Sequence, residues 1–597
     1  MKAPFVPAAA LAASASLVLL VACTGNGPDT PPQSASYQNW DSQEQAWWYE
    51  STQGSRLMPY AWFQALEQPG SDQPFLADDH MKSFRFVPRT TSFNVRLPVG
   101  FAIDRTRDEI LHETSPTRLR WFADQPSNEP WIGLNCSACH TAVLNHQGRS
   151  LVVDGGPSLV DFQSFTEAID AALVATRDDP AKWERFAGRV LTGKDTPANR
   201  DMLGAALGRL IAWEEAAERL NKTPLRYGFA RVDAFGHIYN KVALFTGAEN
   251  PEINPADAPV SYPFLWDIYR HDRLQWNGIA GSARIKLGDS YLDYGAMGRN
   301  TGEVLGVFGD IVVKDQLNLS GYPSTVRTDN LNRLEMLLAK LRRPAWPTDL
   351  FGATDPAKVQ AGQQLYEAKC QGCHAIQPGA EPYKVKMVPL AGPEENRTDP
   401  WMACNAFSYQ TASGRLENQR SNIVAGARIS DPAPLSTLLA TTVKGALAAQ
   451  KGRILAEAAN TWLGVDRPPR VVTRAPQTAV ERRAERLQHC LDQGGELMAY
   501  KSRPLDGIWA TAPYLHNGSV PTLYDLLLPA AQRPARFRVG TRDYDPVRVG
   551  YVTGDATGNS FVFDTSLTGN SNAGHDYRVG ELTDAQRWAL VEYMKTL

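Results

Sequence analysis

Two copies of the pentapeptide Cys-x-x-Cys-His constrain this chain more than any other feature. Two thiols three residues apart on one turn can each form a thioether to a porphyrin vinyl group, and the adjacent histidine then lies under the iron as its axial ligand. A zinc site is the alternative, but it needs a second Cys or His pair close to each motif, which is missing. The pattern predicts two covalently bound haem c groups, attached through Cys136 and Cys139 and through Cys370 and Cys373, with His140 and His374 as iron ligands.

The N-terminus is typical of an exported lipoprotein. A short apolar stretch rich in Ala, Leu and Val ends in Leu20-Val21-Ala22-Cys23, and the small residues before its end indicate a signal peptide. These four residues resemble a bacterial lipobox, which predicts removal of residues 1–22 and lipidation of Cys23. An uncleaved membrane helix is the alternative, but Pro4, Pro7 and the shortness of the apolar core disfavour it.

The residues after the lipobox predict a tether and a location. Residues 24–36 are rich in Pro, Gly and Ser, so we expect 23–37 to form a flexible link between the lipid and the first domain. Thr24 stands where a lipoprotein kept in the inner membrane would be expected to carry Asp. The sequence therefore predicts a protein of the periplasm or cell surface, held on the outer membrane by a lipid anchor that does not span it.

Length and charge bound the range of functions. The 597 residues can bury at least two cores, and a hydrophobic content of 43% with 15 Trp and 20 Tyr is typical of packed globular domains. The 61 basic and 64 acidic residues leave a net charge of −3, which gives no electrostatic reason to expect nucleic acid as a partner. A small or neutral substrate fits this balance better.

The two motifs divide the chain into two expected domains. The first is an enlarged N-terminal haem 1 domain at 38–347, and the second is a haem 2 domain at 348–597. The second begins with an N-cap and a helix-starting proline at Asp355-Pro356, and it ends with a helix behind the capping box Thr583-Asp584-Ala585-Gln586. These two helices resemble the first and last helices of a class I cytochrome c domain.

We expect a mainly α-helical fold with long irregular loops and few strands, made of two cytochrome c-like haem domains of which the first is much enlarged. Aliphatic spacing predicts helices at 157–176 and 198–220. No repeat of about 20 to 50 residues is visible beyond the two motifs. Cys404 and Cys490 lie outside the motifs, and in an oxidising compartment they either pair in a disulfide or stay as thiols.

The sixth iron ligand decides which haem can react. An iron with histidine on both faces only transfers electrons, whereas one with a single histidine can bind dioxygen or peroxide. Of the remaining histidines, His516 and His575 lie in Gly- and Asn-rich loops, which let the backbone approach a flat macrocycle closely. Met387, Met402 and Met498 are the competing thioether ligands.

Several stretches resemble the bacterial di-haem rubber oxygenase family, an enlarged and distant relative of the di-haem cytochrome c peroxidases and methylamine-utilisation di-haem enzymes. The resemblance covers the chain from about Gln38 to its end. The Thr-Ala-Pro-Tyr-x-His-x-Gly element at 511–518 is shared by the whole superfamily, whereas Gly-Asn-Ser-Asn-Ala-Gly-His at 569–575 points more narrowly. The other similar stretches are 503–523, Phe264-Leu265-Trp266-Asp267 and Gln275-Trp276-Asn277-Gly278.

The resemblance implies an oxygenase with unequal haems. The haem on His140 would have an open or dioxygen-bound distal face and be the active site, while the haem on His374 would take His575 as its second ligand. Dioxygen would be added across a carbon–carbon double bond of an isoprenoid or related alkene, as a small molecule or a polymer, with a redox partner protein as a further expectation. An apolar distal pocket is also implied, with the candidates Phe264, Trp266, Trp276 and Phe308.

Two departures from the family keep other functions open. The lipobox differs from a freely secreted enzyme that attacks a polymer, which favours a smaller or membrane-derived alkene. The Phe-x-Asp-Gly-Arg stretch of an ordinary di-haem peroxidase is absent; residues 297–303 stand in a loosely similar position, and Glu303 is the candidate acid or base for peroxide cleavage. The alternatives are therefore a di-haem cytochrome c peroxidase and an electron-transfer cytochrome without a substrate of its own.

Overall fold

The computed structural model describes residues 38–282, 284–287, 290–376, 384–423, 426–451, 479–554 and 561–597. The predicted signal peptide at 1–22, the tether at 23–37 and the lipidation site Cys23 lie outside the described residues. Within the described part of the chain, no helix combines the length and the apolar character needed to cross a membrane.

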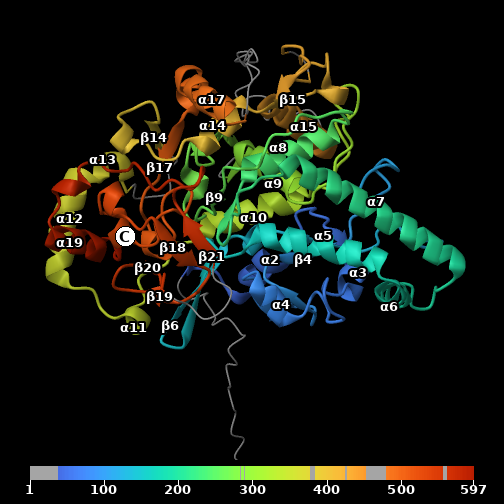
Figure 1. Ribbon diagram of the computed structural model, residues 1–597, viewed down its shortest axis with the longest axis horizontal. Helices are drawn as coiled ribbons and strands as arrows, with labels where there is room; N and C mark the ends of the chain where they lie inside the picture. The colour runs from blue at the N-terminus through green and yellow to red at the C-terminus, as the bar shows by residue number, and fades with distance from the viewer. Residues whose placement is uncertain are drawn as a thin grey trace, which may run out of the picture.

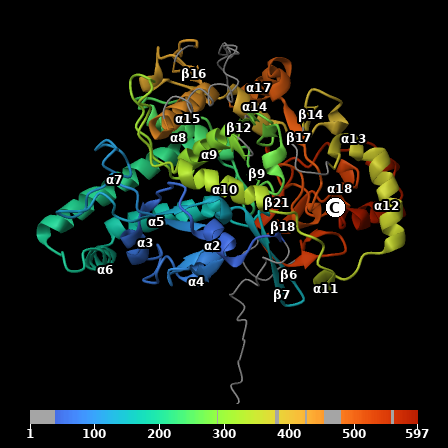
Figure 2. The ribbon, with the colours of Figure 1, turned by 180° about the vertical axis from the view of Figure 1, so that it is seen from behind.

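Helices form three groups (Figure 1, and from behind in Figure 2). One group runs from below the middle of the molecule to one end of its longest axis, which α6 and α7 reach; it holds α2 (Ser42–Glu50), α3 (Tyr60–Ala65), α4 (Asp78–Ser83), α5 (Phe162–Asp178), α6 (Pro180–Val190) and α7 (Pro197–Asn221). The middle holds α8 (Ala234–Phe245), α9 (Tyr294–Gly306), α10 (Thr328–Lys340), α14 (Trp401–Ser408), α15 (Leu435–Lys451) and α17 (Ala479–Gln493). The other end holds α11 (Thr348–Phe351), α12 (Pro356–Lys369), α13 (Gln371–His374), α18 (Leu523–Leu526) and α19 (Asp584–Met594). The expectation of a mainly helical fold is confirmed.

Strands are short and pair as small antiparallel sheets, so they are more numerous than the few that we expected. One sheet has three strands, in the order β1 (Met58–Pro59), β5 (Trp131–Leu134) and β4 (Phe101–Asp104). The two-stranded pairs are β2 (Pro88–Thr90) with β3 (Arg96–Pro98), β6 (Thr141–His146) with β7 (Arg149–Asp154), β8 (Arg231–Val232) with β9 (Val260–Ser261), β10 (Arg273–Leu274) with β11 (Ala280–Gly281), β12 (Arg284–Leu287) with β13 (Ser290–Asp293), β14 (Lys386–Pro389) with β17 (Ala499–Ser502), β15 (Gln410–Thr411) with β16 (Ala433–Pro434), β18 (Arg536–Val539) with β21 (Phe561–Asp564), and β19 (Tyr544–Asp545) with β20 (Gly550–Tyr551).

The capping residues predicted the starts of two helices of the second domain correctly. The Asp355 side chain accepts hydrogen bonds from two amides of the first turn of α12, which has Pro356 at its first position. Thr583 and Gln586 form the expected capping box before α19. Helices α5 and α7 occupy most of the predicted ranges 157–176 and 198–220, and α5 begins later than predicted because Asp161 caps it.

The largest hydrophobic core draws residues from both predicted domains. It contains Trp40 and Trp266 from the first range and Trp509 and Leu597 from the second. A second core lies wholly in the first range and is built largely from aromatic residues around α3, α5 and α7. The two halves therefore pack against each other over a shared apolar interior, and the boundary at 347/348 stays a prediction.

Two segments, one from each half, adopt the same local backbone conformation. They are residues 261–280 and 501–520, and each carries a short 3-10 turn, η2 (Ile268–Arg270) in the first and η6 (Ile508–Ala510) in the second. Left-handed φ angles recur at equivalent positions: Asp267 and Gly507 (60° and 64°), Gln275 and Leu515 (63° each), and Gly278 and Gly518 (65° and 69°).

The contacts between these segments are reciprocal. The Ser261 amide donates to the His516 carbonyl at 2.8 Å, and the Lys501 amide donates to the Trp276 carbonyl at 2.8 Å. Ser261 and Lys501 are 240 positions apart, and so are Trp276 and His516, so each bond joins the positions equivalent to those of the other. The two segments are thus related by an approximate two-fold axis, a repeat of backbone conformation that is not visible as a repeat of residues in the sequence.

Cys404 and Cys490 form a disulfide that ties α14 to α17. Their Cα atoms lie 5.4 Å apart across a sequence separation of 86 residues, and both side chains are fully buried. Closing a loop of this length restricts the unfolded chain, so Cys404→Ser/Cys490→Ser is expected to lower the free energy of unfolding by about 2 kcal/mol. Calorimetry of the purified protein measures this, and equal melting temperatures for wild type and double variant would show that the bond does not form in solution.

Candidate haem centres

The first motif forms a tight turn, η1 (Cys136–Ala138), between β5 and the β6–β7 hairpin. The His140 amide donates to the Cys136 carbonyl at 3.0 Å, and the Gly155 amide donates to the His140 carbonyl at 2.9 Å. Gly100, at φ +83°, approaches so closely that a Cβ there would lie 2.2 Å from the Ala138 amide nitrogen. His140 is therefore fixed at the base of the hairpin, on the same turn as both thiols.

The second motif repeats this turn at the end of a helix. α12 leads into Cys370, and the His374 amide donates to the Cys370 carbonyl at 2.9 Å. The Tyr366 hydroxyl of α12 donates to the His374 carbonyl at 2.5 Å. None of the four motif cysteines is in a disulfide, so each pair of thiols is available for thioether bonds to a haem.

His575 lies opposite His374. Their ring centroids are 6.1 Å apart. Metal–imidazole bonds of about 2 Å on each side, plus the distance from each ring nitrogen to its ring centre, add to roughly 6 Å. The separation of the two rings fits an iron held between them.

The loop that carries His575 is held by backbone contacts on both sides. His575 has a left-handed φ of 52°, and its amide donates to the Asn396 carbonyl. Gly574 packs so tightly that a Cβ there would lie 2.2 Å from the Arg397 carbonyl oxygen. The Arg533 guanidinium donates to the Gly574 carbonyl at 2.8 Å. The Gly-Asn-rich sequence therefore serves to bring His575 close to His374.

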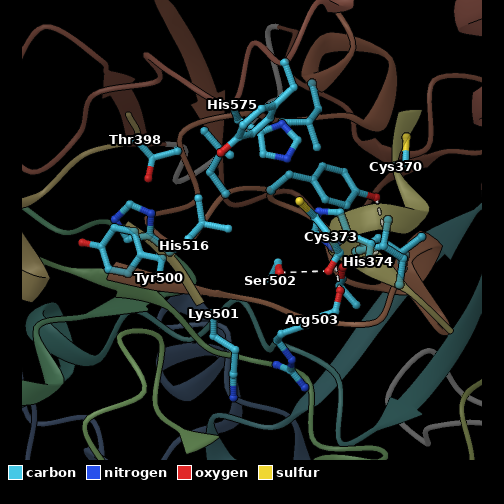
Figure 3. A pocket seen from close by; sticks show the side chains of 18 of the residues that line it. Cys370, Cys373, His374, Thr398, Tyr500, Lys501, Ser502, Arg503, His516 and His575 are labelled. Carbon is cyan, nitrogen blue, oxygen red and sulfur yellow. Dashed lines mark hydrogen bonds between the residues drawn. The ribbon is translucent and has the colours of Figure 1, made fainter. Parts of the chain in front are cut away.

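Both histidines line a largely apolar cavity of about 280 Å³. Figure 3 shows His575 above and His374 beside the opening, with Cys373 next to His374. The Ser502 hydroxyl donates to the Cys373 carbonyl at 2.9 Å. A flat apolar macrocycle fits these walls, whose aliphatic members are Val388, Leu390, Leu505, Ile508, Leu515, Leu526, Leu527, Val579, Leu582 and Leu590.

Burial keeps the motif histidines neutral. It lowers the pKa of His140 to about 4, with the nearby Pro263 carbonyl acting in the opposite direction. Burial, with a smaller effect of the neighbouring His374 in the same direction, lowers the pKa of His575 to about 3. The pKa of His374 is also lowered by burial. A neutral imidazole keeps the lone pair that an iron ligand must offer.

The repeated segments place a carbonyl group beside each proximal ring. His374 Nδ1 donates to the Arg503 carbonyl at 2.7 Å. The Pro263 carbonyl, at the equivalent position of the first segment, lies near the His140 ring, but His140 Nδ1 makes no hydrogen bond with the described residues. A carbonyl acceptor on one ring nitrogen fixes the orientation of the imidazole and leaves the other nitrogen for the metal. In the described part of the chain, the His374 ring has this support and the His140 ring does not.

Glu303 lies near the first motif, as predicted for an acid or base. It stands on α9, its carboxylate accepts a hydrogen bond from Gln275 Nε2 at 2.9 Å, and Arg299 Nε is 3.9 Å away. Desolvation raises the pKa of its carboxyl, and its charge acts on the thiols of Cys136 and Cys139. Its place fits the predicted role.

The four aromatic candidates lie at different places. Phe264 and Trp276 line the cavity that contains His374 and His575. Trp266 is fully buried, and its Nε1 donates to the Asp506 carbonyl at 2.7 Å across the interface between the halves. Phe308 packs in the second core, with its ring 6.0 Å from that of Phe162. Phe264, Trp266 and Trp276 contact residues of the second half, whereas Phe308 packs in the core built from the first half. The role of these four residues as walls of the first pocket stays a prediction.

The competing ligands of the second haem are placed less favourably. His516 lines the same cavity, but its ring packs on Tyr500 at 4.1 Å and lies 6.5 Å from Trp276. Met387 packs against Gly278, and Met402 and Met498 are buried in the large core. Geometry thus favours His575 over these alternatives.

Several residues of the two repeated segments that surround the motifs were not predicted from the sequence. Tyr262 contacts the Cys139 thiol at the position where Ser502 contacts Cys373. Arg503 and Lys501 were also not identified. The Asn-Gly dipeptides at 277–278 and 517–518 could have indicated the repeat, but few other residues are identical between the two segments.

Comparison with known proteins agrees with a haem cytochrome. A family model described as RoxA-like, cytochrome c-like matches residues 499–538, which include most of the second repeated segment. The chain is 33% identical over 601 residues to the uncharacterized protein y4iJ of Sinorhizobium fredii, covering 94% of this chain and 92% of that protein. It is 41% identical over 122 residues to the uncharacterized protein y4iM of the same organism, covering 17% of this chain and 28% of that protein. The chain thus carries a RoxA-like cytochrome c domain at 499–538 and belongs to the same family as y4iJ.

Proposed function

We propose that this protein is a di-haem c-type cytochrome oxygenase that adds dioxygen across a carbon–carbon double bond of an isoprenoid or related alkene. The difference between the two motifs carries the proposal. The His374 ring faces a second histidine ring at 6.1 Å, whereas the aromatic ring beside His140 is Tyr262, and none of the described histidines approaches His140 in the same way. A site with two histidines suits electron transfer, and a site with one suits reaction with dioxygen.

The residues of the first half suit an apolar reaction. Haem c, when bound there, supplies the chemistry that activates dioxygen, and the protein supplies position and environment. His140 stays neutral because burial lowers its pKa. Ala138, within the first motif, and Phe308 belong to one buried apolar cluster, which keeps water away from this side of the motif. Trp276, between the halves, would assist electron exchange between the two haems.

A peroxidase is the second candidate, and Glu303 is the observation that favours it. Cleavage of a peroxide bond needs an acid or base within reach of the oxygen atoms. The raised pKa of Glu303 and its hydrogen bond from Gln275 suit a group that holds and releases a proton. This candidate predicts that Glu303→Gln slows peroxide reduction.

Oxygen uptake tests the proposal. The purified protein with its haems is expected to consume dioxygen when squalene or polyisoprene latex is added, without peroxide or external reductant, and to release aldehydes and ketones. Cys136→Ser/Cys139→Ser should abolish this uptake because it removes the first haem attachment, while mass spectrometry should show two haem additions on the wild type and one on the variant. Peroxide turnover with a reduced cytochrome donor, without oxygen uptake, would replace the oxygenase by a peroxidase. If both haem irons have two protein ligands and neither reaction occurs, the remaining function is electron transfer.

A further inference from the structure

Positively charged groups gather in the interior between the two motifs. Lys501 in β17 and Arg503 directly after it come from the second half, and Arg270 comes from the first; they are 6%, 4% and 5% exposed. The Arg299 side chain on α9 is 8% exposed. The His271 ring beside them is 2% exposed and uncharged, because burial lowers its pKa well below the usual value. Burying charged groups costs free energy unless anions face them.

Lys501 lacks a carboxylate counter-ion within the described part of the chain. Its Nζ donates to the Arg273 carbonyl at 3.1 Å and lies 3.4 Å from His271 Nδ1, and no described carboxylate oxygen lies within 4.0 Å. Asp272 acts on it from beyond that distance. Burial lowers the pKa of the Lys501 ammonium well below its usual value, so its charged form needs an anion close by, and a ligand carboxylate would supply one.

Arg503 links this cluster to the first motif. Its Nη2 donates to the Phe264 carbonyl at 2.6 Å, and the guanidinium carbon lies 3.5 Å from the centre of the Phe264 ring. Its charge, with that of Arg299, acts on the buried His140 ring. Figure 3 shows Lys501 and Arg503 leaving the strand on the same side, away from His575. The two side chains therefore reach from the second half into the first.

The carboxylates of this region form ion pairs with the arginines. Arg299 Nη2 lies 2.5 Å from a Glu335 oxygen, and Arg299 Nε lies 3.9 Å from Glu303. Arg270 Nη1 lies 3.8 Å from an Asp267 oxygen. These pairs leave Lys501 as the cation that most needs an added anion.

The second motif has no equivalent pair of cations. Under the two-fold relation, Lys501 and Arg503 correspond to Ser261 and Pro263, which carry no charge. The charged side chain that acts on His374 is Lys386, which is exposed to solvent. Lys501 and Arg503 also border the cavity of His374 and His575, but the Arg503 charge lowers the pKa of His140, whereas the charge that lowers the pKa of His374 is that of Lys386.

We propose that Lys501 and Arg503 bind the propionate carboxylates of the haem attached to the first motif and raise its reduction potential above that of the second haem. The inference rests on the proposed attachment of two haems. Positive charge beside a haem stabilises the reduced state, which carries one positive charge fewer. An electron shared by the pair then settles on the first haem, where an oxygenase needs reduced iron.

Spectroelectrochemical titration of the holoprotein tests the proposal. Lys501→Gln and Arg503→Gln are each expected to shift the midpoint potential of the first haem downward, and the double variant to shift it further, with the second haem changed much less. Lys386→Gln is the matched control, since it removes a charge near the second motif and should leave the first haem unchanged. Lys501→Arg keeps the charge and should restore the wild-type potential.

Other outcomes would overturn the proposal. An unchanged first-haem potential in both Gln variants means that the two side chains do not bind a propionate, and equal shifts of both haems indicate a general loss of packing. If a Gln variant fails to fold, Lys501→Arg and Arg503→Lys remain informative, because a large potential shift with charge retained would contradict an electrostatic role. Oxygen uptake is not needed for this readout, and haem content by mass spectrometry separates its failure from that of the oxygenase assignment.

Discussion

Replacing His575 with Ala is expected to convert the second haem from a low-spin, two-histidine species to a high-spin or water-ligated one, while the first haem keeps its spectrum. The reason is geometric: the His575 ring lies 6.1 Å from the His374 ring, and both rings line the same apolar cavity. Electron paramagnetic resonance on the purified variant measures the change, because the low-spin signal should be lost completely.

His516→Ala is the matched control for this prediction. His516 lines the same cavity, but its ring packs on Tyr500 instead of facing His374. The low-spin signal should therefore survive in His516→Ala. Survival of that signal in His575→Ala, with its loss in His516→Ala, would transfer the ligand role to His516.

Local chemistry made much of the fold predictable. Helix α12 begins at Pro356 and α19 follows Thr583 because short-range capping hydrogen bonds decide where a helix starts, and these depend on neighbouring residues alone. The two Cys-x-x-Cys-His turns form for the same reason: the bond from each histidine amide closes on the first cysteine of its own motif.

Long-range relations could not be predicted in the same way. The disulfide between Cys404 and Cys490 joins residues 86 positions apart, and their meeting depends on how α14 packs on α17. The repeated segments are similar in backbone, not in side chains: Trp276 stands where the other half has His516, and Pro263 where it has Arg503. A search for repeated residues overlooks a repeat of this kind, and with it the cations that Lys501 and Arg503 bring to the first motif.

The crossing of α12 and α19 depends on one glycine, so Gly362→Ala is expected to destabilise the protein by about 3 kcal/mol. A Cβ at Gly362 would lie 2.0 Å from the Ala589 carbonyl oxygen of α19, and backbone cannot yield as a flexible side chain can. The helices would have to separate, which also moves Tyr366 and the hydrogen bond that it donates to the His374 carbonyl. Thermal unfolding of the holoprotein and the low-spin signal of the second haem should therefore change together.

Gly208→Ala is the matched control for that change, since it places the same methyl group on a helix in the other half. Gly208 lies in α7, and a Cβ there would meet no atom within 4 Å. Alanine is favoured over glycine inside a helix, so this variant should be as stable as the wild type or more stable by about 0.5 to 1 kcal/mol. The same substitution is thus expected to act with opposite signs at the two positions, because at Gly362 the close contact with α19 outweighs the helix preference. Equal stabilisation by both variants would show that α12 and α19 do not cross at Gly362, and the support of His374 by Tyr366 would then need another explanation.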